Sequence, residues 1–341
     1  MNNYEINIAL QTNKRISEYG PLARQIENLE FDGLSVYNDM LYQPAWLPLL
    51  EIARNTKKIT IGPASVNPFT CHPINIAGNI SLIDEASNSR AYLGLARGAW
   101  LDFVGVRPKS PVRGLKEAMD AIRHLLKQST IELPGKIFPL AGGDSLHWKI
   151  LRDDIPFLLG SWGPKTIQAC IHQISELKLG GTANPDVIPW IQSIIGKATE
   201  KINRDVSEVG LTIGAVSVVD QDGDKARDLA RNNVALYLPV VAQLDPTLKL
   251  DKDLLSSIQK AAANYDFKEA SEHIDDELLQ KVTFAGTPDE IITQTCDLFK
   301  KGVNRIEHGT PHGSITGKEG IEVLGTEVLP RVKEKMRIKN A

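Results

Sequence analysis

Residues 6–30 read INIALQTNKRISEYGPLARQIENLE, a short apolar stretch followed by a helical pattern. Residues 6–10 are predicted to form a β-strand, because they are apolar and end at polar residues. Leu22, Ala23, Ile26 and Leu29 then recur at the spacing of one face of an amphipathic helix. This stretch is therefore one strand followed by one helix, and the rest of the chain repeats the unit.

The same alternation predicts seven more strands along the chain. They are expected at residues 33–37, 58–62, 91–95, 155–160, 177–181, 211–219 and 303–307, and the intervening helices at 45–54, 74–86, 115–126, 164–174, 187–203, 224–241 and 321–336. An open, doubly wound sheet usually has fewer strands and a glycine-rich first turn, which Gln11-Thr12-Asn13 lacks. We therefore expect a parallel (β/α)8 barrel, the TIM barrel.

Two segments interrupt the alternation without indicating a separate domain. Residues 128–155 contain several prolines and glycines and predict an excursion such as a hairpin, whereas residues 244–283 predict a helical insertion without a strand. The sequence Thr287-Pro288-Asp289-Glu290 is a capping box that starts a further helix, and Gly302 is placed to end it. We expect one domain over residues 1–341.

Composition excludes several classes of protein. The 39 basic and 42 acidic residues give a net charge of -3 without a long run of either sign, so nucleic acid is not an expected partner. The three cysteines have no disulfide or zinc spacing, and no long apolar segment predicts export or a membrane span. A cytoplasmic protein that acts on a small molecule is expected.

The loops that follow barrel strands normally build the active site. The turn from Gly160 to Lys165 runs directly into a helix with proline at its first position, so the backbone amides of Ser161, Trp162 and Gly163 are candidates for binding an anion such as phosphate. The glycines also have a purely steric explanation. Arg97, followed by Gly98, comes after the fourth strand and is a second candidate, with a surface salt bridge as the alternative.

Other polar residues after the strands have weaker support from the sequence. Asp39 is a candidate acid or hydrogen-bond acceptor after strand two, with a solvated carboxylate as the alternative. His308 and His312 flank a Gly-Thr-Pro turn, but metal hydrolases of this architecture usually carry a His-x-His after strand one, so no metal site is expected. Lys178 is a less favoured candidate for a Schiff-base lysine.

Several motifs resemble the luciferase-like superfamily in order and spacing, from the first strand to the last. They are GPASVNPFTCHP (62–73), LIDEASNSRAYLGLARG (82–98), GSWGP (160–164), TANP (182–185), AGTPDE (285–290) and GTP (309–311). The chain looks most similar to the deazaflavin-dependent methylenetetrahydromethanopterin reductases within that superfamily.

The resemblance implies a barrel that holds coenzyme F420, a deazaflavin, with its ring over strand three beside a non-prolyl cis peptide at Ala64-Ser65. The cofactor-binding residues that it implies are Asn38, Ala64, Ser65, Asn67, Arg97, Gly98, Ser161, Trp162, Gly163, Thr182 and Asn184. The expected activity is hydride transfer between F420 and a small organic substrate, with the cofactor supplying the redox chemistry. The family also suggests a homodimer, with residues 74–86 as a plausible contact.

The chain departs from the family at two positions near the expected reaction centre. Asn38-Asp39 stands where relatives frequently carry Asp-His, and Ala9 stands where the methanopterin reductases carry a buried glutamate. Asp39 is therefore our candidate for proton handling, with Gln11 as a hydrogen-bonding group and His308 or Glu307 as further candidates. The alternatives are an FMN-dependent monooxygenase and a barrel that binds flavin without turnover.

Overall fold

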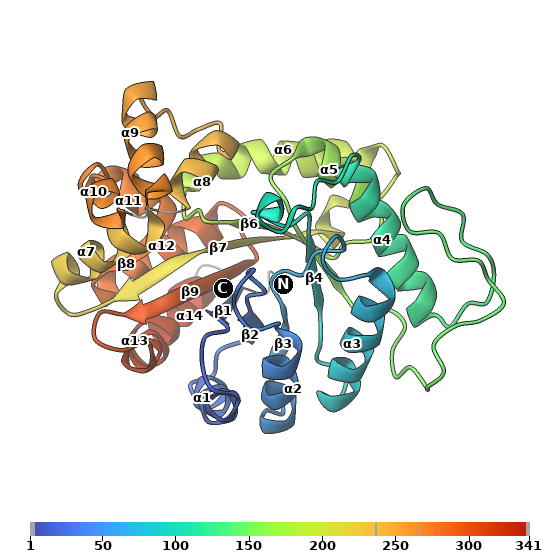
Figure 1. Cartoon of the computed structure of the whole chain (residues 1–341). Coiled ribbons are helices and arrows are strands. Elements are labelled where there is room, and N and C mark those ends of the chain that lie inside the picture. Colours follow the sequence, from blue (N-terminus) through green and yellow to red (C-terminus); the bar gives the residue numbers. More distant parts are fainter. Residues whose placement is uncertain (1–3, 236, 265, 339–341) are drawn as a thin grey trace.

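A computed structural model describes residues 4–235, 237–264 and 266–338, and its centre is a parallel β-barrel surrounded by helices (Figure 1). The strands follow one another in the order β3-β2-β1-β9-β7-β6-β5-β4, and β8 pairs with β7 outside this path. Their bounds are β1 Glu5–Leu10, β2 Gly33–Val36, β3 Thr60–Pro63, β4 Leu93–Ala96, β5 Phe157–Gly160, β6 Glu176–Gly180, β7 Gly210–Val219, β8 Thr283–Gly286 and β9 Arg305–Gly313.

The two ends of this path meet, so the sheet is a nearly closed ring. Parallel bridges join Ile61 to Ala91 and Val66 to Leu95, next to β3 and β4. Backbone hydrogen bonds run across the same seam, including that from the Tyr92 amide to the Ile61 carbonyl at 2.9 Å. The predicted (β/α)8 barrel is confirmed, with β9 as the eighth strand of the ring.

The segment between β7 and β9 differs from the prediction, because it contains the strand β8. One edge of β7 pairs with β6 along Gly210–Gly214, and the other edge pairs with β9. β8 pairs with Val216–Val219 of β7, on the edge that β6 leaves free after Gly214. The predicted helical insertion without a strand, residues 244–283, was therefore wrong at its last residue, because β8 begins at Thr283. The strand predicted at residues 303–307 was too short, because β9 continues to Gly313.

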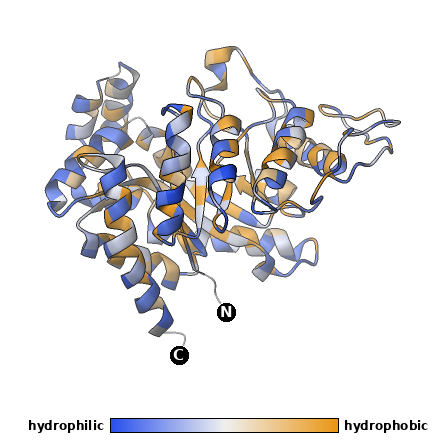
Figure 2. Ribbon diagram, turned by 90° about the horizontal axis from the view of Figure 1, so that it is seen from below, coloured by the Kyte–Doolittle hydropathy of each residue, from blue (hydrophilic) through white to orange (hydrophobic). Residues whose placement is uncertain are grey.

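Helices connect the strands and cover the outside of the barrel. Their outward faces are polar and their inward faces apolar, as Figure 2 shows from below. The α-helices are α1 Ile16–Asn28, α2 Trp46–Asn55, α3 Pro73–Ala86, α4 Pro111–Leu126, α5 Pro164–Cys170, α6 Ile188–Glu200, α7 Gly223–Val234, α8 Leu238–Leu244, α9 Lys252–Ala263, α10 Phe267–Glu272, α11 Asp276–Val282, α12 Pro288–Lys300, α13 Gly317–Val323 and α14 Leu329–Ile338. Among the described residues, no helix has both the length and the apolar character of a bilayer-spanning segment.

Local sequence signals explain where several of these helices begin and end. The capping box of α12 is present: the Thr287 hydroxyl accepts from the Glu290 amide, and the Glu290 carboxylate accepts from the Thr287 amide. Gly302, just beyond α12, has a φ of +97°, as predicted for a residue that ends a helix in the left-handed region. The apolar stripe of α4 is buried, including Leu115 and Met119.

The two interrupting segments lie at opposite sides of the barrel (Figure 1). The segment 128–155 extends beyond α4 as a long loop, in which Leu133 and Leu140 form an antiparallel bridge. Between β7 and β8, α7 is followed by the short helices α8 to α11. Tyr237 at the start of α8, and Val240, Val241 and Leu244 within α8, line a cavity.

Candidate functional site

A cavity of about 1450 Å³ lies at the carboxyl ends of the barrel strands. This is the end at which TIM barrels carry their active sites. Residues from nearly every strand end contribute to its wall, which also includes parts of α1, α8 and α13. The residues that line it include Gln11, Lys14, Tyr37, Asp39, Tyr42, Ala64, Arg97, Trp100, Asp102, Trp162, Lys178, Gly214, Asn233, Tyr237, Thr310 and His312.

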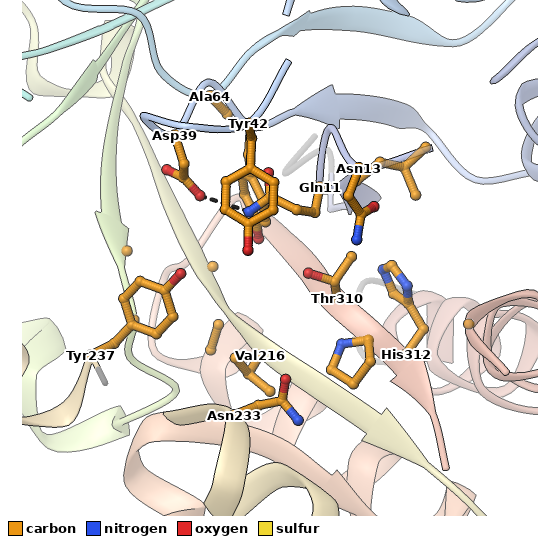
Figure 3. Close-up of a pocket in the computed structure, with 18 of the residues that line it drawn as sticks. Gln11, Asn13, Asp39, Tyr42, Ala64, Val216, Asn233, Tyr237, Thr310 and His312 are labelled. Atoms are coloured by element: carbon orange, nitrogen blue, oxygen red, sulfur yellow. Dashed lines mark hydrogen bonds between the residues drawn. The ribbon is translucent and has the colours of Figure 1, made fainter. Parts of the chain in front are cut away.

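Gln11 and Asp39 form a hydrogen-bonded pair in the wall, from the ends of β1 and β2. Gln11 Nε2 donates to Asp39 Oδ2 at 2.8 Å (Figure 3). Gln11 Oε1 accepts from the Thr12 amide at 2.9 Å, which fixes the amide orientation. The structure thus brings together two of the three predicted catalytic residues and holds the Asp39 carboxylate at the cavity through a neutral donor.

Two tyrosines share the electrostatic environment of Asp39. Burial raises the pKa of Tyr237 to about 12, and the Asp39 carboxylate contributes in the same direction. Burial also raises the pKa of Tyr37 well above its ordinary value, with further contributions from Glu307 and Asp39. Both hydroxyl groups therefore stay protonated at neutral pH and can donate hydrogen bonds into the cavity.

Aromatic rings and one cation form another part of the wall. Trp100 packs edge-on against Tyr237 with 5.8 Å between ring centroids, and Trp162 Nε1 donates to the Gly180 carbonyl at 3.3 Å. Arg97 is exposed and has neither an ion pair nor a hydrogen bond within the part of the chain that the structure describes. This wall could hold a flat aromatic ligand that carries an anionic group.

The turn from Ser161 to Gly163 is less open to an anion than its sequence indicates. The Ser161 amide donates to the Lys178 carbonyl at 3.2 Å, and the Gly163 amide donates to Ser161 Oγ at 3.2 Å. Of the three predicted amides, only that of Trp162 lacks a partner among the described residues. Anion binding here would depend on this amide, the start of α5 and Arg97.

The cis peptide that the family resemblance implies is present between Ala64 and Ser65. Ala64 lines the cavity, whereas Ser65 does not. The Ser65 hydroxyl instead lies near Gly94 and Gly160 of the neighbouring strands β4 and β5. The residue at the cavity wall is therefore Ala64.

Several other predicted cofactor residues have partners inside the protein and lie outside the cavity wall. Asn38 Oδ1 accepts from the Ala45 amide, and Asn67 Oδ1 accepts from the amides of Phe69 and Thr70. Gly98, with a φ of +90°, packs against the Asn67 side chain. The Asn184 amide donates to Thr182 Oγ1, and Asn184 Nδ2 donates to Asp245 Oδ2 and Thr247 Oγ1. In this structure these side chains hold the loops around the cavity.

His308 lies away from the cavity, behind β9. Successive strand residues point to opposite faces, so Glu307 faces the barrel interior and His308 packs outward between Ser217 and Phe284. Burial lowers its pKa to about 3. His312 does line the cavity, and its Nε2 donates to the His308 carbonyl at 3.1 Å.

The comparisons with known proteins agree with this architecture. The model of the luciferase-like monooxygenase family matches residues 4–305. The chain belongs to this family. The chain is 29% identical to the 5,10-methylenetetrahydromethanopterin reductase of Archaeoglobus fulgidus, over 83% of this chain and 86% of that protein, and 28% identical to the Methanopyrus kandleri reductase, over 82% and 84%.

Two solved structures of F420-dependent proteins share the fold of this luciferase-like chain. The coenzyme F420-dependent tetrahydromethanopterin reductase of Methanopyrus kandleri has a TM-score of 0.87 at 23% identity, covering 97% of this chain and 99% of that one. An F420-dependent secondary alcohol dehydrogenase has a TM-score of 0.78 at 19% identity, covering 97% and 99%. The predicted family, and with it an oxidoreductase, is confirmed.

This family member also has an ion pair beneath the cavity that the sequence analysis did not predict. Lys178 Nζ donates to Glu307 Oε2, and Ser35 Oγ donates to Glu307 Oε1 at 2.8 Å. Ser35 Oγ lies 2.6 Å from the Tyr92 hydroxyl. Lys178 and Glu307 are 129 positions apart. The only sequence signal was that each is a charged residue within a predicted strand.

Proposed function

We propose that this luciferase-like protein binds coenzyme F420 in the cavity and transfers hydride between the cofactor and a small organic substrate. The observation that supports the proposal most is the similarity to methylenetetrahydromethanopterin reductases over more than four fifths of the chain. The finer assignment, reduction of that pterin, has less support, because Ala9 replaces the glutamate that the reductases carry.

The residues of the cavity suit such a cofactor. Its volume of about 1450 Å³ exceeds the roughly 300–1,000 Å³ of most small-molecule sites and leaves room for a substrate beside a large ligand. Ala64 and the aromatic wall at Trp100 and Tyr237 would contact the ring system, and Arg97 with the Trp162 amide would bind the phosphate. When bound, the deazaflavin would supply the hydride chemistry at its C5 position.

The protein's own residues would orient the substrate and handle its proton. Asp39 is held by Gln11 in the cavity wall, where its carboxylate can take part in proton transfer or bind the reacting group. Tyr37 and Tyr237 would remain neutral hydrogen-bond donors. Tyr237 directly precedes α8, which forms part of the cavity wall, so it would help to exclude water.

Titration with purified cofactors tests this proposal. We expect the chain to quench the fluorescence of F420 in a saturable manner and to bind FMN at least tenfold more weakly. A screen of small carbonyl compounds, alcohols and pterins with F420 then reports turnover as a change in cofactor absorbance. Preferential binding of FMN with consumption of dioxygen would instead favour a monooxygenase. Tight binding of F420 without turnover of any substrate would favour a binding protein.

A further inference from the structure

The floor of the cavity carries a charged side chain at a place where barrels of this type are usually apolar. Lys178 belongs to β6, lines the cavity and is 7% exposed. Its partner Glu307 on β9 is fully buried. Removing two charges from water costs free energy, and the attraction between them often does no more than offset this cost. A buried ion pair is therefore weak evidence for a purely stabilising role.

The course of the Lys178 side chain depends on a glycine. β7 lies between β6 and β9, and Gly214 of β7 pairs with Gly180 on one side and with Glu307 on the other. A Cβ atom at position 214 would lie 3.0 Å from Lys178 Cε and 3.5 Å from Nζ. Lys178 can therefore cross β7 to reach Glu307 because residue 214 has no side chain.

This arrangement leaves part of the ammonium group free for a ligand. A lysine ammonium has three N–H donors, and Glu307 is its only hydrogen-bond partner among the described residues. Glu307 is itself held by Ser35, which fixes the carboxylate and, through it, the ammonium. The centroid of the Tyr37 ring lies 5.7 Å from Nζ, and the carboxylates of Glu307 and Asp39 both contribute to raising the pKa of Tyr37.

We propose that Lys178 binds the oxygen atom of the substrate and stabilises the negative charge that develops there, so that the substrate is a carbonyl compound or the corresponding alcohol. This inference rests on the proposed function for the source of the hydride. A cation at the cavity floor favours a reacting group that becomes negative and disfavours one that is positively charged.

The reaction balances with the groups already named. When bound, the reduced deazaflavin would supply the hydride that forms the new C–H bond at the carbonyl carbon, and the π electron pair of the C=O bond would move to oxygen. The carbonyl compound is reduced and the deazaflavin oxidised. Lys178 stabilises the oxygen as its charge grows, and the proton of the alcohol arrives through Asp39. The reverse sequence oxidises an alcohol.

A matched pair of small probes tests the proposal without the cofactor. Acetate and acetamide have nearly the same shape, but only acetate is an anion like the developing oxygen. Their dissociation constants are measured by NMR titration at neutral pH, with the melting temperature of each variant as a check on folding. In the wild type, acetate should bind roughly tenfold or more tightly than acetamide, as expected for a charge-assisted hydrogen bond.

Four variants separate Lys178 from its surroundings. Lys178→Gln should reduce acetate binding to the level of acetamide, and Gly214→Ala should weaken it because the added methyl group displaces Lys178. Glu307→Gln, which keeps the acceptor for Ser35, should strengthen acetate binding because the ammonium loses its compensating charge. Arg97→Gln, which removes a cation that lines the cavity in addition to Lys14, Lys178 and Lys318, should leave the preference for acetate intact.

Two results would overturn the proposal. One is an unchanged acetate preference in folded Lys178→Gln, and the other is its loss in Arg97→Gln alone. A purely structural ion pair also predicts that Glu307→Gln lowers the melting temperature without strengthening acetate binding. F420 titrations of the same variants keep the two hypotheses apart. If Lys178→Gln binds acetate as the wild type does and F420 binding is normal, only this inference is contradicted. If the wild type does not bind F420, the proposed function is contradicted.

Discussion

Asp39 is placed to act on a substrate because its partner in the wall is a neutral amide rather than a cation. Asp39→Asn keeps the shape and still allows one hydrogen bond with Gln11, but it removes the group that can carry a proton. We expect kcat to fall by roughly 10² to 10⁴ while F420 binding remains within a few-fold. Steady-state kinetics and cofactor titration on the one variant measure both quantities.

Asp102 offers a matched control for this experiment. It also lines the cavity, but its carboxylate forms an exposed ion pair with Arg107 at 3.0 Å. Asp102→Asn should therefore change kcat less than threefold. Full activity in Asp39→Asn, or an equal loss in both variants, would remove Asp39 from the reaction.

The buried histidines predict how stability depends on pH. Burial lowers the pKa of His308 to about 3, and neighbouring His312 adds to the effect. The unfolded chain has the ordinary value of about 6.5 and therefore binds a proton that the folded state does not. The contribution of neutral His308 is fully present above pH 6.5 and is lost as the pH falls toward about 3.

His308→Asn tests this dependence, since asparagine can keep the bond to Ser217 but does not titrate. Between pH 7 and pH 5, the wild type should lose about 2 kcal/mol more of its free energy of unfolding than the variant does. Urea unfolding at the two pH values gives the difference. Parallel losses in both proteins would show that His308 does not titrate as a buried group.

At the scale of single residues, the sequence predicted the site residues that directly follow a strand. It did not predict contacts between residues that are distant in the sequence. Gln11 and Asp39 each follow a strand, and that rule alone placed them at the cavity. His308 also follows the expected strand, but β9 continues past it and turns its side chain outward. The room that Gly214 leaves for the Lys178 side chain could not be predicted, because it depends on a lysine from the neighbouring strand.

Among the elements, α5 carries the clearest prediction for cofactor binding. Gly163 precedes α5 with a φ of -83°, and an added Cβ would lie no closer than 3.4 Å to its neighbours. Valine should therefore fold normally at this position but block the close approach of a phosphate. We expect Gly163→Val to weaken F420 binding several-fold or more with little change in melting temperature.

Gly196 of α6 is a suitable control, because a Cβ at this position meets open space. Gly196→Val should leave cofactor affinity unchanged. If Gly163→Val also binds F420 normally, the phosphate does not contact this turn, and Arg97 would become the first residue to replace.

The elements that the sequence predicted well are those with strong periodicity and caps. The stripe of α4 and the capping box of α12 are examples. β8 was missed because its four residues directly follow α11 and are all buried, so neither a turn signal nor alternation marks it. β9 was predicted too short because Gly309-Thr310-Pro311 has the composition of a turn, although it continues the strand.

For the whole molecule, α3 provides the test of the predicted homodimer. Ile74 and Leu82 leave 45% and 49% of their surfaces exposed on this helix, which belongs to the region 74–86 expected at the contact. If two copies meet there, Leu82→Glu should shift the protein from dimer to monomer in sedimentation velocity experiments, because an unpaired carboxylate would be buried.

Ile131 is the matched control, since it is 74% exposed in the loop that extends beyond α4. Ile131→Glu should leave the sedimentation coefficient unchanged. A monomeric wild type, or a Leu82→Glu variant that remains dimeric, would place the contact elsewhere or exclude it.

The pairing of β8 with β7 makes the chain between these two strands, which includes α7 to α11, a segment that begins and ends at neighbouring positions of the barrel. Val216 lies beside Thr283, so the segment that contributes Tyr237, Val240, Val241 and Leu244 leaves the barrel and returns to it along one strand pair. Gln11 and Asp39 follow β1 and β2, and Lys178 lies on β6, so all three are outside this segment. Exchanging this segment between homologues should therefore alter which substrates enter while conserving the chemistry beneath, a route by which natural recombination or laboratory evolution can generate new specificities on one scaffold.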